Sequence, residues 1–268
     1  MATMPDQAAG LRQPTTTPPL RLPGFAVTGG KGGVGKTCIA VNLAILLAKS
    51  GLKPLLIDLD MGLANADIML GVDPQQTLAD VVLNGRPIES VITESPLGVG
   101  LVPAASGVEA LANLGAQELQ RLFFGLERLG RSRSPLILDT PAGIGREVIA
   151  AARAVSTVCV VLTPEPTALA DAYALIKLLE QAQPGQDVRI VVNMARDQHD
   201  GLTAFAKMRA VAKKHLGRDV ELLGIIPRDD MVAMAVRRRT PFATGLDGPA
   251  LSALKGIAAK LRGINWAG

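Results

Sequence analysis

A glycine-rich stretch near the start of the chain, "FAVTGGKGGVGKTCIAV", constrains the fold more than any other feature. From Gly30 to Thr37 it fits the pattern G-x-x-x-x-G-K-[ST], which needs an apolar strand before it and a helix after it. Residues 25–29 form a β-rich apolar run, and residues 36–49 have a helical period. Glycines let backbone N–H groups surround phosphate oxygens, and the helix N-terminus adds the positive end of its dipole. The stretch therefore predicts a strand, a phosphate-binding loop and a helix.

The side chains of this loop indicate a nucleotide with Mg²⁺. Lys36 would place its charge at the β and γ phosphates, and Thr37 would place its hydroxyl on the metal ion. A second lysine, Lys31, has no role in a loop that only binds phosphate. The loop residues expected at the nucleotide are Gly30, Lys31, Gly32, Gly33, Val34, Gly35, Lys36 and Thr37.

After the loop, short apolar runs alternate with longer segments of helical period, which is typical of a parallel sheet covered on both faces. The predicted strands are 25–29, 54–60, 99–104, 135–140, 157–163, 188–194 and 220–227. The predicted helices are 36–49, 117–129, 167–181, 202–216 and 249–261. We therefore expect an α/β fold of three layers, α/β/α, with a mostly parallel sheet of about seven to eight strands.

The chain divides into an arm and one domain. Of its 268 residues, 48% are hydrophobic and 19% are charged, which is enough apolar material for one substantial core. Residues 24–268 should form that domain. Residues 1–23 combine a short polar helical candidate with the linker "PTTTPPLRLP", whose prolines favour extended backbone, so we expect a flexible arm.

Acidic residues follow two of the predicted strands. "LILDTPAG" places Asp139 where it can hold a Mg²⁺-bound water, with the Gly143 amide available to sense a γ-phosphate. "LLIDLD" places Asp58 and Asp60 on one side of the pleat, because strand side chains repeat every two residues. One of the two could orient the attacking water, and Asp58 could equally contact the metal or cap the following turn.

Other compositional features exclude several classes of protein. The two cysteines, Cys38 and Cys159, lie in apolar segments and are expected to be buried thiols. No apolar run approaches the roughly 20 residues of a membrane-spanning helix, and no secretory signal is present, so we expect a cytoplasmic protein. With aromatic residues at 3%, sequence-specific nucleic-acid binding is not expected.

The segments "KGGVGKT", "DLDMGLANAD" and "LDTPAG" together resemble those of the MinD/ParA class of P-loop ATPases, and the resemblance covers nearly all of residues 24–262. It implies ATP hydrolysis to ADP with Mg²⁺ and a homodimer in the ATP state. It also implies that Lys31 reaches the partner subunit's nucleotide and that Asp60 positions the hydrolytic water. Asp139 takes the place of the Walker B carboxylate, with Lys36 and Thr37 on the phosphates and metal.

The same resemblance implies contacts with the base. Asn193 matches the asparagine that reads adenine, and Pro227, Arg228 and Asp229 match the loop that flanks it. Cys38 replaces the second threonine usual in the class. Its backbone amide could still contact the α-phosphate, but a hydroxyl contact is lost.

Within the class, "DMGLANADIMLG" is most similar to the flagellar-number regulators called FlhG, FleN or YlxH, with Asn65 and Gly143 as switch positions. A D-Q-A-x-x-L-R segment before the P-loop is a feature of that subfamily, where it activates the partner GTPase FlhF. The matching residues are Asp6, Gln7, Ala8, Leu11 and Arg12. The resemblance thus implies control of flagellar number or placement through an FlhF-type GTPase, and in some relatives through an enhancer-binding transcription activator.

Several alternatives stay open on the sequence. A ParA-type partition ATPase would bind DNA non-specifically as an ATP dimer, and Arg237–Arg239 could contact phosphates or form a solvated surface. The basic amphipathic segment 251–268 could bind the inner face of the membrane, through Ile264 and Trp266, or its part 251–261 could be the last core helix. An iron–sulfur reductase would need paired cysteines that this chain lacks, and an amidotransferase-linked synthetase would need substrate elements that we do not find.

Overall fold

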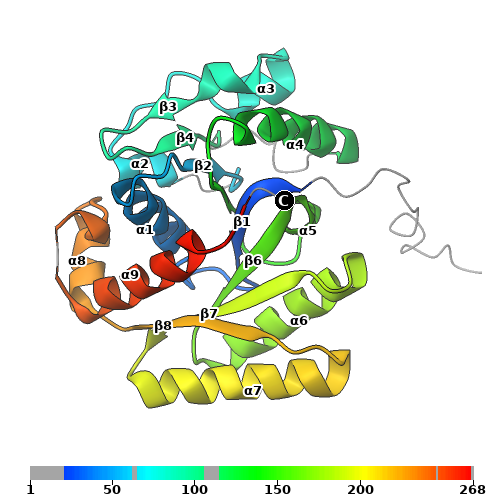
Figure 1. Ribbon diagram of the computed structural model, residues 1–268, viewed down its shortest axis with the longest axis vertical. Helices are drawn as coiled ribbons and strands as arrows, with labels where there is room; N and C mark the ends of the chain where they lie inside the picture. Colours follow the sequence, from blue (N-terminus) through cyan, green and yellow to red (C-terminus); the bar gives the residue numbers. More distant parts are fainter. Residues whose placement is uncertain (1–20, 62–64, 106–114, 246, 267–268) are drawn as a thin grey trace, which may run out of the picture.

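The computed structural model describes residues 21–61, 65–105, 115–245 and 247–266. Within these ranges an eight-stranded sheet forms the middle layer, in the order β3-β4-β2-β5-β1-β6-β7-β8. All paired strands are parallel except β3 with β4. Helices cover both faces (Figure 1), and the predicted three-layer α/β/α fold is confirmed.

The strands have the following bounds: β1 Leu22–Thr28, β2 Leu55–Asp58, β3 Thr93–Glu94, β4 Gly100–Val102, β5 Leu136–Asp139, β6 Val155–Leu162, β7 Asp187–Ala195 and β8 Glu221–Pro227. The helices are α1 Lys36–Lys49, α2 Ala66–Leu70, α3 Leu78–Asn84, α4 Ala116–Gly130, α5 Arg146–Ala154, α6 Pro166–Ala182, α7 Gln198–Leu216, α8 Asp230–Arg237 and α9 Pro249–Arg262. In the described residues, 3₁₀ turns lie at Ile88–Val91 and Phe242–Thr244.

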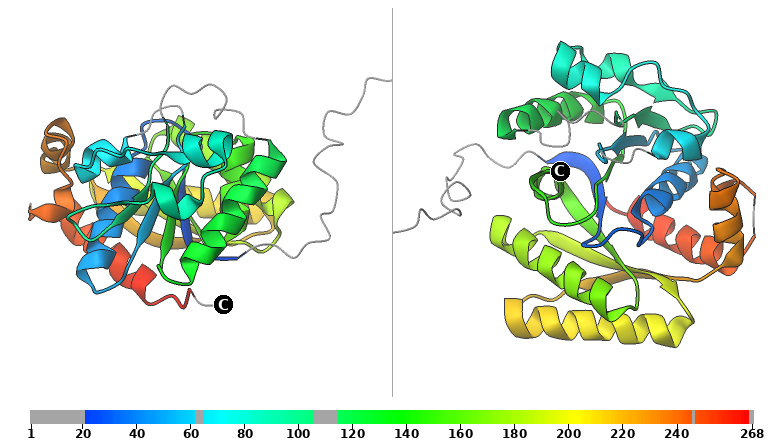
Figure 2. Two further views of the ribbon diagram at one scale, coloured as in Figure 1. Left: turned by 90° about the horizontal axis from the view of Figure 1, so that it is seen from above. Right: turned by 180° about the vertical axis from the view of Figure 1, so that it is seen from behind.

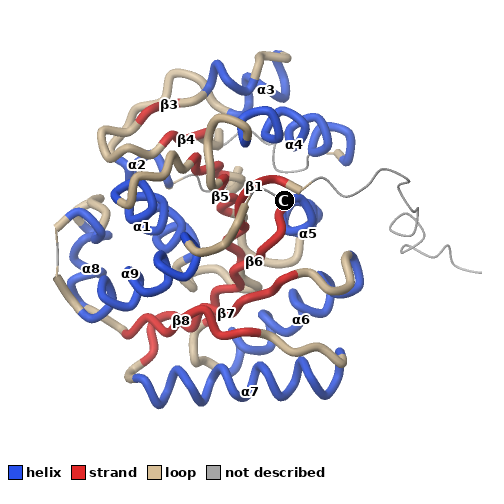
Figure 3. Tube along the Cα trace, in the orientation of Figure 1, coloured by secondary structure: helices blue, strands red, loops and turns tan. Residues whose placement is uncertain are grey.

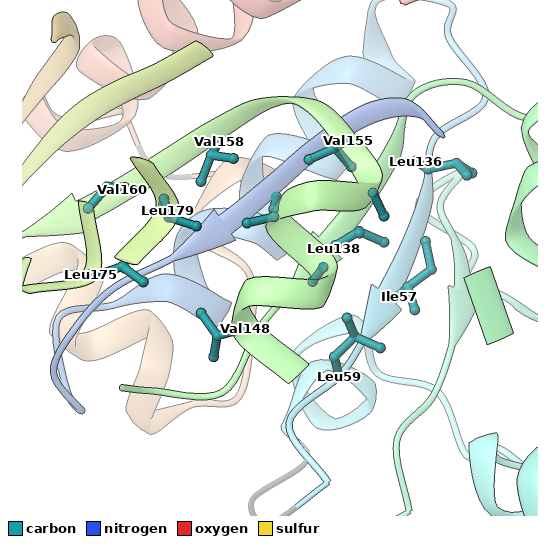
Figure 4. Packing of buried hydrophobic residues seen from close by; sticks show 14 of the residues in the cluster. Ile57, Leu59, Leu136, Leu138, Val148, Val155, Val158, Val160, Leu175 and Leu179 are labelled. Atoms are coloured by element: carbon teal, nitrogen blue, oxygen red, sulfur yellow. The ribbon is translucent and has the colours of Figure 1, made fainter. Parts of the chain in front are cut away.

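Alternate residues of the central strands point to opposite faces of the sheet, because side chains in a strand repeat every two residues. Leu56 of β2 and Ile137 of β5 pack with α1, α2, α8 and α9 on one face. Ile57 and Leu138 pack with α4, α5, α6 and α7 on the other. Figure 4 shows both side chains together with others of this cluster, and Figure 2 shows the layers of helices and strands in two further views. Because both faces are covered, these strands are apolar up to their last residues, Asp58 and Asp139, as expected of a parallel sheet.

Some element boundaries differ from those predicted. β1 begins at Leu22 rather than 25, so Leu22 and Pro23 of the predicted arm belong to the sheet. The register of β1 on β6 shifts between Leu22 and Phe25, so an irregularity of the strand accommodates Pro23, which has no N–H to donate. Residues 1–20, including the predicted partner-binding segment, lie outside the described residues.

Parallel strands bring their carboxyl ends to one edge of the sheet. The loops after β1, β2, β5, β6 and β7 therefore meet at that edge, and helices α1 and α6 begin there (Figure 3). This edge holds most of the residues expected to bind nucleotide.

Candidate nucleotide site

The phosphate-binding loop connects β1 directly to α1. Gly33 and Gly35 have φ angles of +79° and +94°, a region that other residues rarely adopt. Gly35 is the N-cap of α1, and no side chain caps the helix. The backbone N–H groups of the first helical turn are therefore available to an anion at the end of the helix dipole.

Two loop glycines also permit close packing. A Cβ atom at Gly35 would lie 2.5 Å from Nδ2 of Asn193, and one at Gly30 would lie 2.2 Å from the backbone oxygen of Asp171 in α6. The beginning of the loop thus lies directly against the backbone of α6. A larger residue at either position would have to move the loop.

Two carboxylates lie side by side beneath the loop. Asp58 and Asp139 are paired in the register of β2 and β5, and both are buried. Asp58 accepts hydrogen bonds from the backbone N–H groups of Asp60, at 2.9 Å, and Ala66, at 3.5 Å. It therefore fastens the segment that follows β2, as the capping alternative predicted.

Asp139 has no such support. Neither of its oxygens accepts a hydrogen bond of normal geometry from a described residue. Burial and the neighbouring Asp58 raise the pKa of Asp139 well above its usual range, and the nearby Thr37 hydroxyl and Lys36 charge oppose that shift. Burial likewise raises the pKa of Asp58 to about 7, against the effect of the backbone N–H groups.

These groups fit a divalent cation. A buried carboxylate that no backbone N–H supports gains much from a positive charge, and a hydroxyl and a carboxylate are the oxygen donors that Mg²⁺ prefers. Thr37 and Asp139 are the residues that would hold it, directly or through water. In the part of the chain that the structure describes, no group of three or more His, Cys, Asp or Glu residues could hold a metal by itself.

Lys36 is buried beside these acids. Its pKa is lowered by burial, while the charges of Asp139 and Asp60 act in the opposite direction. A lysine in this position gains from phosphate oxygens, which would restore the favourable charge contacts that burial removes. Asp60 follows the end of β2, and its charge acts on both Lys36 and Asp139.

Lys31, the first lysine of the loop, contacts the beginning of α6. Its Nζ lies 2.9 Å from Oγ1 of Thr167 and 3.3 Å from a carboxylate oxygen of Glu165. Both residues lie at the beginning of α6. We did not predict this contact; the sequence signal that could have indicated it is an acid, Glu165, shortly after the apolar run that forms β6.

Asn193 and Gly143 both contact the loop. The Nδ2 group of Asn193 donates to the carbonyl oxygen of Val34, at 2.8 Å. The N–H of Gly143 donates to the carbonyl oxygen of Gly29, at 3.1 Å. Gly143 has a φ of +100°. Both residues predicted to read the nucleotide are thus next to the loop, and in this state each is hydrogen-bonded to it.

The segment predicted to flank adenine begins at the end of β8. Arg228 is exposed, and its N–H donates to the carbonyl oxygen of Ala195 at the end of β7. The carboxylate of Asp229 caps α8 and also accepts from the N–H of Ala250 at the start of α9. Asp229 thus joins α8 to α9 at the rim of the site. Asn65 lies beyond β2, exposed at the N-cap of α2.

The two cysteines lie in different elements, and the three consecutive arginines lie at the end of α8. Cys159 is buried in β6, whereas Cys38 in α1 is only half-buried, and burial raises the pKa of each thiol to about 12. Arg237 ends α8, and Arg238 and Arg239 follow it on the surface. Arg239 has a φ of +54°, so the three side chains do not continue one helical face.

The apolar face of α9 forms part of the core. Leu251, Leu254, Ile257, Ala258 and Leu261 pack against the face of the sheet that α1 covers. In the described ranges no helix combines the length and apolar character needed to cross a bilayer. A membrane contact through α9 would have to use side chains of the helix other than these packed ones. The membrane contact stays a prediction.

Comparison with known proteins agrees with this geometry. The model of the CobQ/CobB/MinD/ParA nucleotide binding domain matches residues 25–242. The antiactivator FleN of Pseudomonas aeruginosa is 40% identical over 238 residues, which are 88% of this chain and 85% of FleN. The flagellum site-determining protein YlxH of Helicobacter pylori is 33% identical over 216 residues, 80% of this chain and 73% of YlxH. The crystal structure of the Pyrococcus furiosus cell division ATPase MinD superimposes with a TM-score of 0.75 at 26% identity, and the match covers 89% of this chain and 97% of that one.

Proposed function

The chain belongs to the CobQ/CobB/MinD/ParA nucleotide-binding family and is a P-loop ATPase, and from this premise we propose that it is a dimerising switch that controls flagellar number or placement. The sequence similarity to FleN and YlxH supports the flagellar assignment. One observation in the structure supports the switch: Lys31 is bonded to Glu165 and Thr167 at the beginning of α6.

In the proposed cycle, Lys36 and the N–H groups at the start of α1 bind the β and γ phosphates of ATP. Thr37 and Asp139 hold Mg²⁺, which would neutralise part of the phosphate charge. Two ATP-bound chains then dock face to face. Each Lys31 leaves Glu165 and Thr167 and reaches the phosphates of the partner subunit.

Asp60 would orient the water that attacks the γ-phosphate. Hydrolysis removes the phosphate group that Lys31 of the partner subunit contacts, and the dimer then separates. The Gly143 N–H, which donates to Gly29 in the present state, is placed to exchange that bond for a phosphate oxygen. In this proposal the bound nucleotide, ATP or ADP, determines whether the protein is a dimer or a monomer.

The proposed binding partners of the ATP-bound dimer are proteins of the flagellar system. The word antiactivator in the name of FleN suggests, for this chain, inhibition of a transcription activator of the enhancer-binding kind. The segment from Asp6 to Arg12 suggests stimulation of an FlhF-type GTPase. We place the protein in the cytoplasm, with a peripheral membrane contact in the ATP state.

Light scattering in ADP and in ATP tests the switch. The wild type should be a monomer in ADP and should dimerise transiently in ATP, and the Asp60→Ala variant should accumulate as an ATP-bound dimer. An Asp60→Ala variant that stays monomeric in saturating ATP would contradict the proposal. Anionic lipid vesicles added to each state test the membrane contact.

Two further assays test the target. A peptide of residues 1–20 should raise the rate of GTP hydrolysis by an FlhF-type GTPase, and the same peptide with Arg12→Ala should not. A partition ATPase would instead bind non-specific DNA in ATP, in a salt-dependent way that is lost in the triple Arg237→Ala, Arg238→Ala, Arg239→Ala variant.

A further inference from the structure

A methionine beside the phosphate-binding loop has an unusual backbone conformation. Met194 lies near the carboxyl end of β7, and its φ angle is +57°. Residues with a long side chain rarely adopt this left-handed region, because Cβ approaches the following carbonyl oxygen. Within the described ranges, Arg239 is the only other non-glycine residue with a positive φ. The surrounding chain thus holds Met194 in a conformation that costs free energy, and such conformations are found most often at functional sites.

The conformation arises from an irregularity in the pairing of β7 with β8. The register of the two strands shifts between Val192 and Ala195. Asn193 and Met194 are the two residues between them. Ala195 resumes the pairing, and its carbonyl oxygen accepts a hydrogen bond of 2.7 Å from the N–H of Arg228, in the segment predicted to flank the base. Local irregularities such as β-bulges are common beside active sites, where they change the direction of a side chain.

The irregularity brings two consecutive side chains to the same part of the loop. In a regular strand, neighbouring side chains lie on opposite faces of the sheet. Here a Cβ atom at Gly35 would lie 2.5 Å from Nδ2 of Asn193 and 3.8 Å from Cε of Met194. Asn193 is buried and bonded to the loop, whereas Met194 is 45% exposed. Met194 therefore offers an exposed thioether side chain at the start of α1, next to the phosphate site.

The acids beneath the loop indicate the direction in which a nucleotide would lie. Asp58 and Asp139 end β2 and β5, on one side of β1, whereas β6, β7 and β8 lie on the other side. Thr37 and Asp139 would hold Mg²⁺, which bridges the β and γ phosphates in P-loop enzymes. The γ-phosphate therefore belongs on the side of β5. The nucleoside would leave the loop on the side of β7, where Met194 lies.

We propose that the side chain of Met194 forms an apolar wall on which the purine base of the bound nucleotide packs. A thioether is polarisable and makes favourable contacts with aromatic rings. It has no strong hydrogen-bonding group, so it would hold the face of the base rather than read its edge. The inference rests on the nucleotide binding that the proposed function requires, and it adds a residue for the base to the residues for the phosphates.

A second role for Met194 must be separated from this one. Because its side chain lies close to Gly35, Met194 could simply brace the loop. A brace would act on every ligand of the loop, since all of them depend on the loop's shape. A wall for the base would act only on ligands that have a base. Pyrophosphate, which has phosphates and no base, therefore distinguishes the two roles.

Calorimetric titration with Mg-ADP and with Mg-pyrophosphate tests the proposal. In Met194→Gly the Kd for ADP should rise about fivefold, as expected for one lost contact between sulfur and an aromatic ring, and the Kd for pyrophosphate should not change. Met194→Leu keeps an apolar side chain of similar volume and should bind ADP within about twofold of the wild type. An unchanged Kd for ADP in Met194→Gly, or an equal loss for both ligands, would overturn the proposal.

Arg239→Gly is the matched control for the backbone. Arg239 has nearly the same φ, +54°, and lies on the surface after α8. Glycine relieves the left-handed conformation at either position, but only the Met194 variant also loses a side chain at the nucleotide site. Arg239→Gly should therefore bind ADP like the wild type. Equal losses of ADP affinity in the two variants would assign the effect to the glycine backbone and refute the wall.

The methyl resonance of Met194 gives a direct readout of the contact. In protein labelled with ¹³C at the methionine methyl groups, the signal of Met194 is the one that Met194→Leu removes. ADP should move this signal upfield, because an aromatic ring shields a group packed on its face, and pyrophosphate should move it less. A signal that ADP leaves in place would refute the contact. A wild type that binds neither ligand would instead contradict the proposed function, so the two failures are distinguishable.

Discussion

The contact of Lys31 with α6 leads to a quantitative prediction about the dimer. If Lys31 acts in the partner subunit, each chain must first break its bonds to Glu165 and Thr167. Variants that remove these bonds should therefore dimerise more tightly in ATP. The side chains of Lys31 and Glu165 are 40% and 66% exposed, so water screens their ion pair.

The magnitude follows from the two bonds. An exposed ion pair contributes about 0.5 kcal/mol, and the 2.9 Å bond from Lys31 to the Thr167 hydroxyl contributes about 1 kcal/mol. Two chains release the Thr167 bond in each dimer, so Thr167→Val should tighten the dimer by about 2 kcal/mol, or roughly thirtyfold in Kd. Adding Glu165→Gln should contribute about another fivefold.

The assay is sedimentation equilibrium in ATP with Asp60→Ala in every chain, so that hydrolysis does not consume the dimer. Glu165 is the N-cap residue of α6 but its side chain makes no capping bond, so Glu165→Gln should leave the helix intact. The matched control is Asp247→Asn, which removes another exposed ion pair, with Lys255 at 3.8 Å, and should not change Kd. An unchanged or weaker dimer in Thr167→Val would refute the reasoning.

Three further predictions concern the loop and the buried acids. Lys31→Ala should abolish the dimer and most ATP turnover but keep nucleotide affinity within a few-fold, which fluorescence titration with a labelled nucleotide would measure. Gly35→Ala should weaken both stability and nucleotide binding, because the new Cβ would lie 2.5 Å from Asn193 Nδ2 at a φ of +94°; a thermal midpoint equal to that of the wild type would contradict this. The pKa of Asp58 is raised from an ordinary 3.8 to about 7 in the nucleotide-free folded state. Between these two values the folded state keeps a proton on Asp58 that the unfolded state has lost. The contribution of Asp58 to the free energy of unfolding therefore falls as the pH rises from about 4 to 7. Asp58→Asn should flatten that decline in thermal unfolding scans, and an unchanged slope would exclude Asp58 as its source.

The sequence predicted those helices and strands that are marked by residues close together in the chain. Helix α1 has the predicted bounds, 36–49, because the glycine loop fixes its start and the apolar run fixes its extent. The strands that end in Asp58 and Asp139 were found for a similar reason, since both are apolar runs broken by an acid. Both faces of these strands are covered, so hydrophobicity alone marks them.

Other features depend on residues far apart in the chain. The bond between Lys31 and Thr167 joins positions 136 residues apart, and no local pattern indicates it. Helix α5 was missed because its apolar positions are mostly alanines, Ala151 and Ala152 among them, which give a weak periodic signal. Strand β3 has two residues at the edge of the sheet, which is too short for any period to appear.

The position of β1 in the sheet bears on how the protein is made. Among the described strands β1 is synthesised first, yet both of its neighbours, β5 and β6, come more than a hundred residues later. At ordinary rates of translation, Leu162 at the end of β6 leaves the ribosome's active site roughly 7 to 28 s after Leu22. Throughout that interval the apolar run from Phe25 to Val27 has neither partner strand available. Nascent chains of this length should therefore be clients of ribosome-associated chaperones, and no ATP can be bound in the native manner until Asp139 has been added.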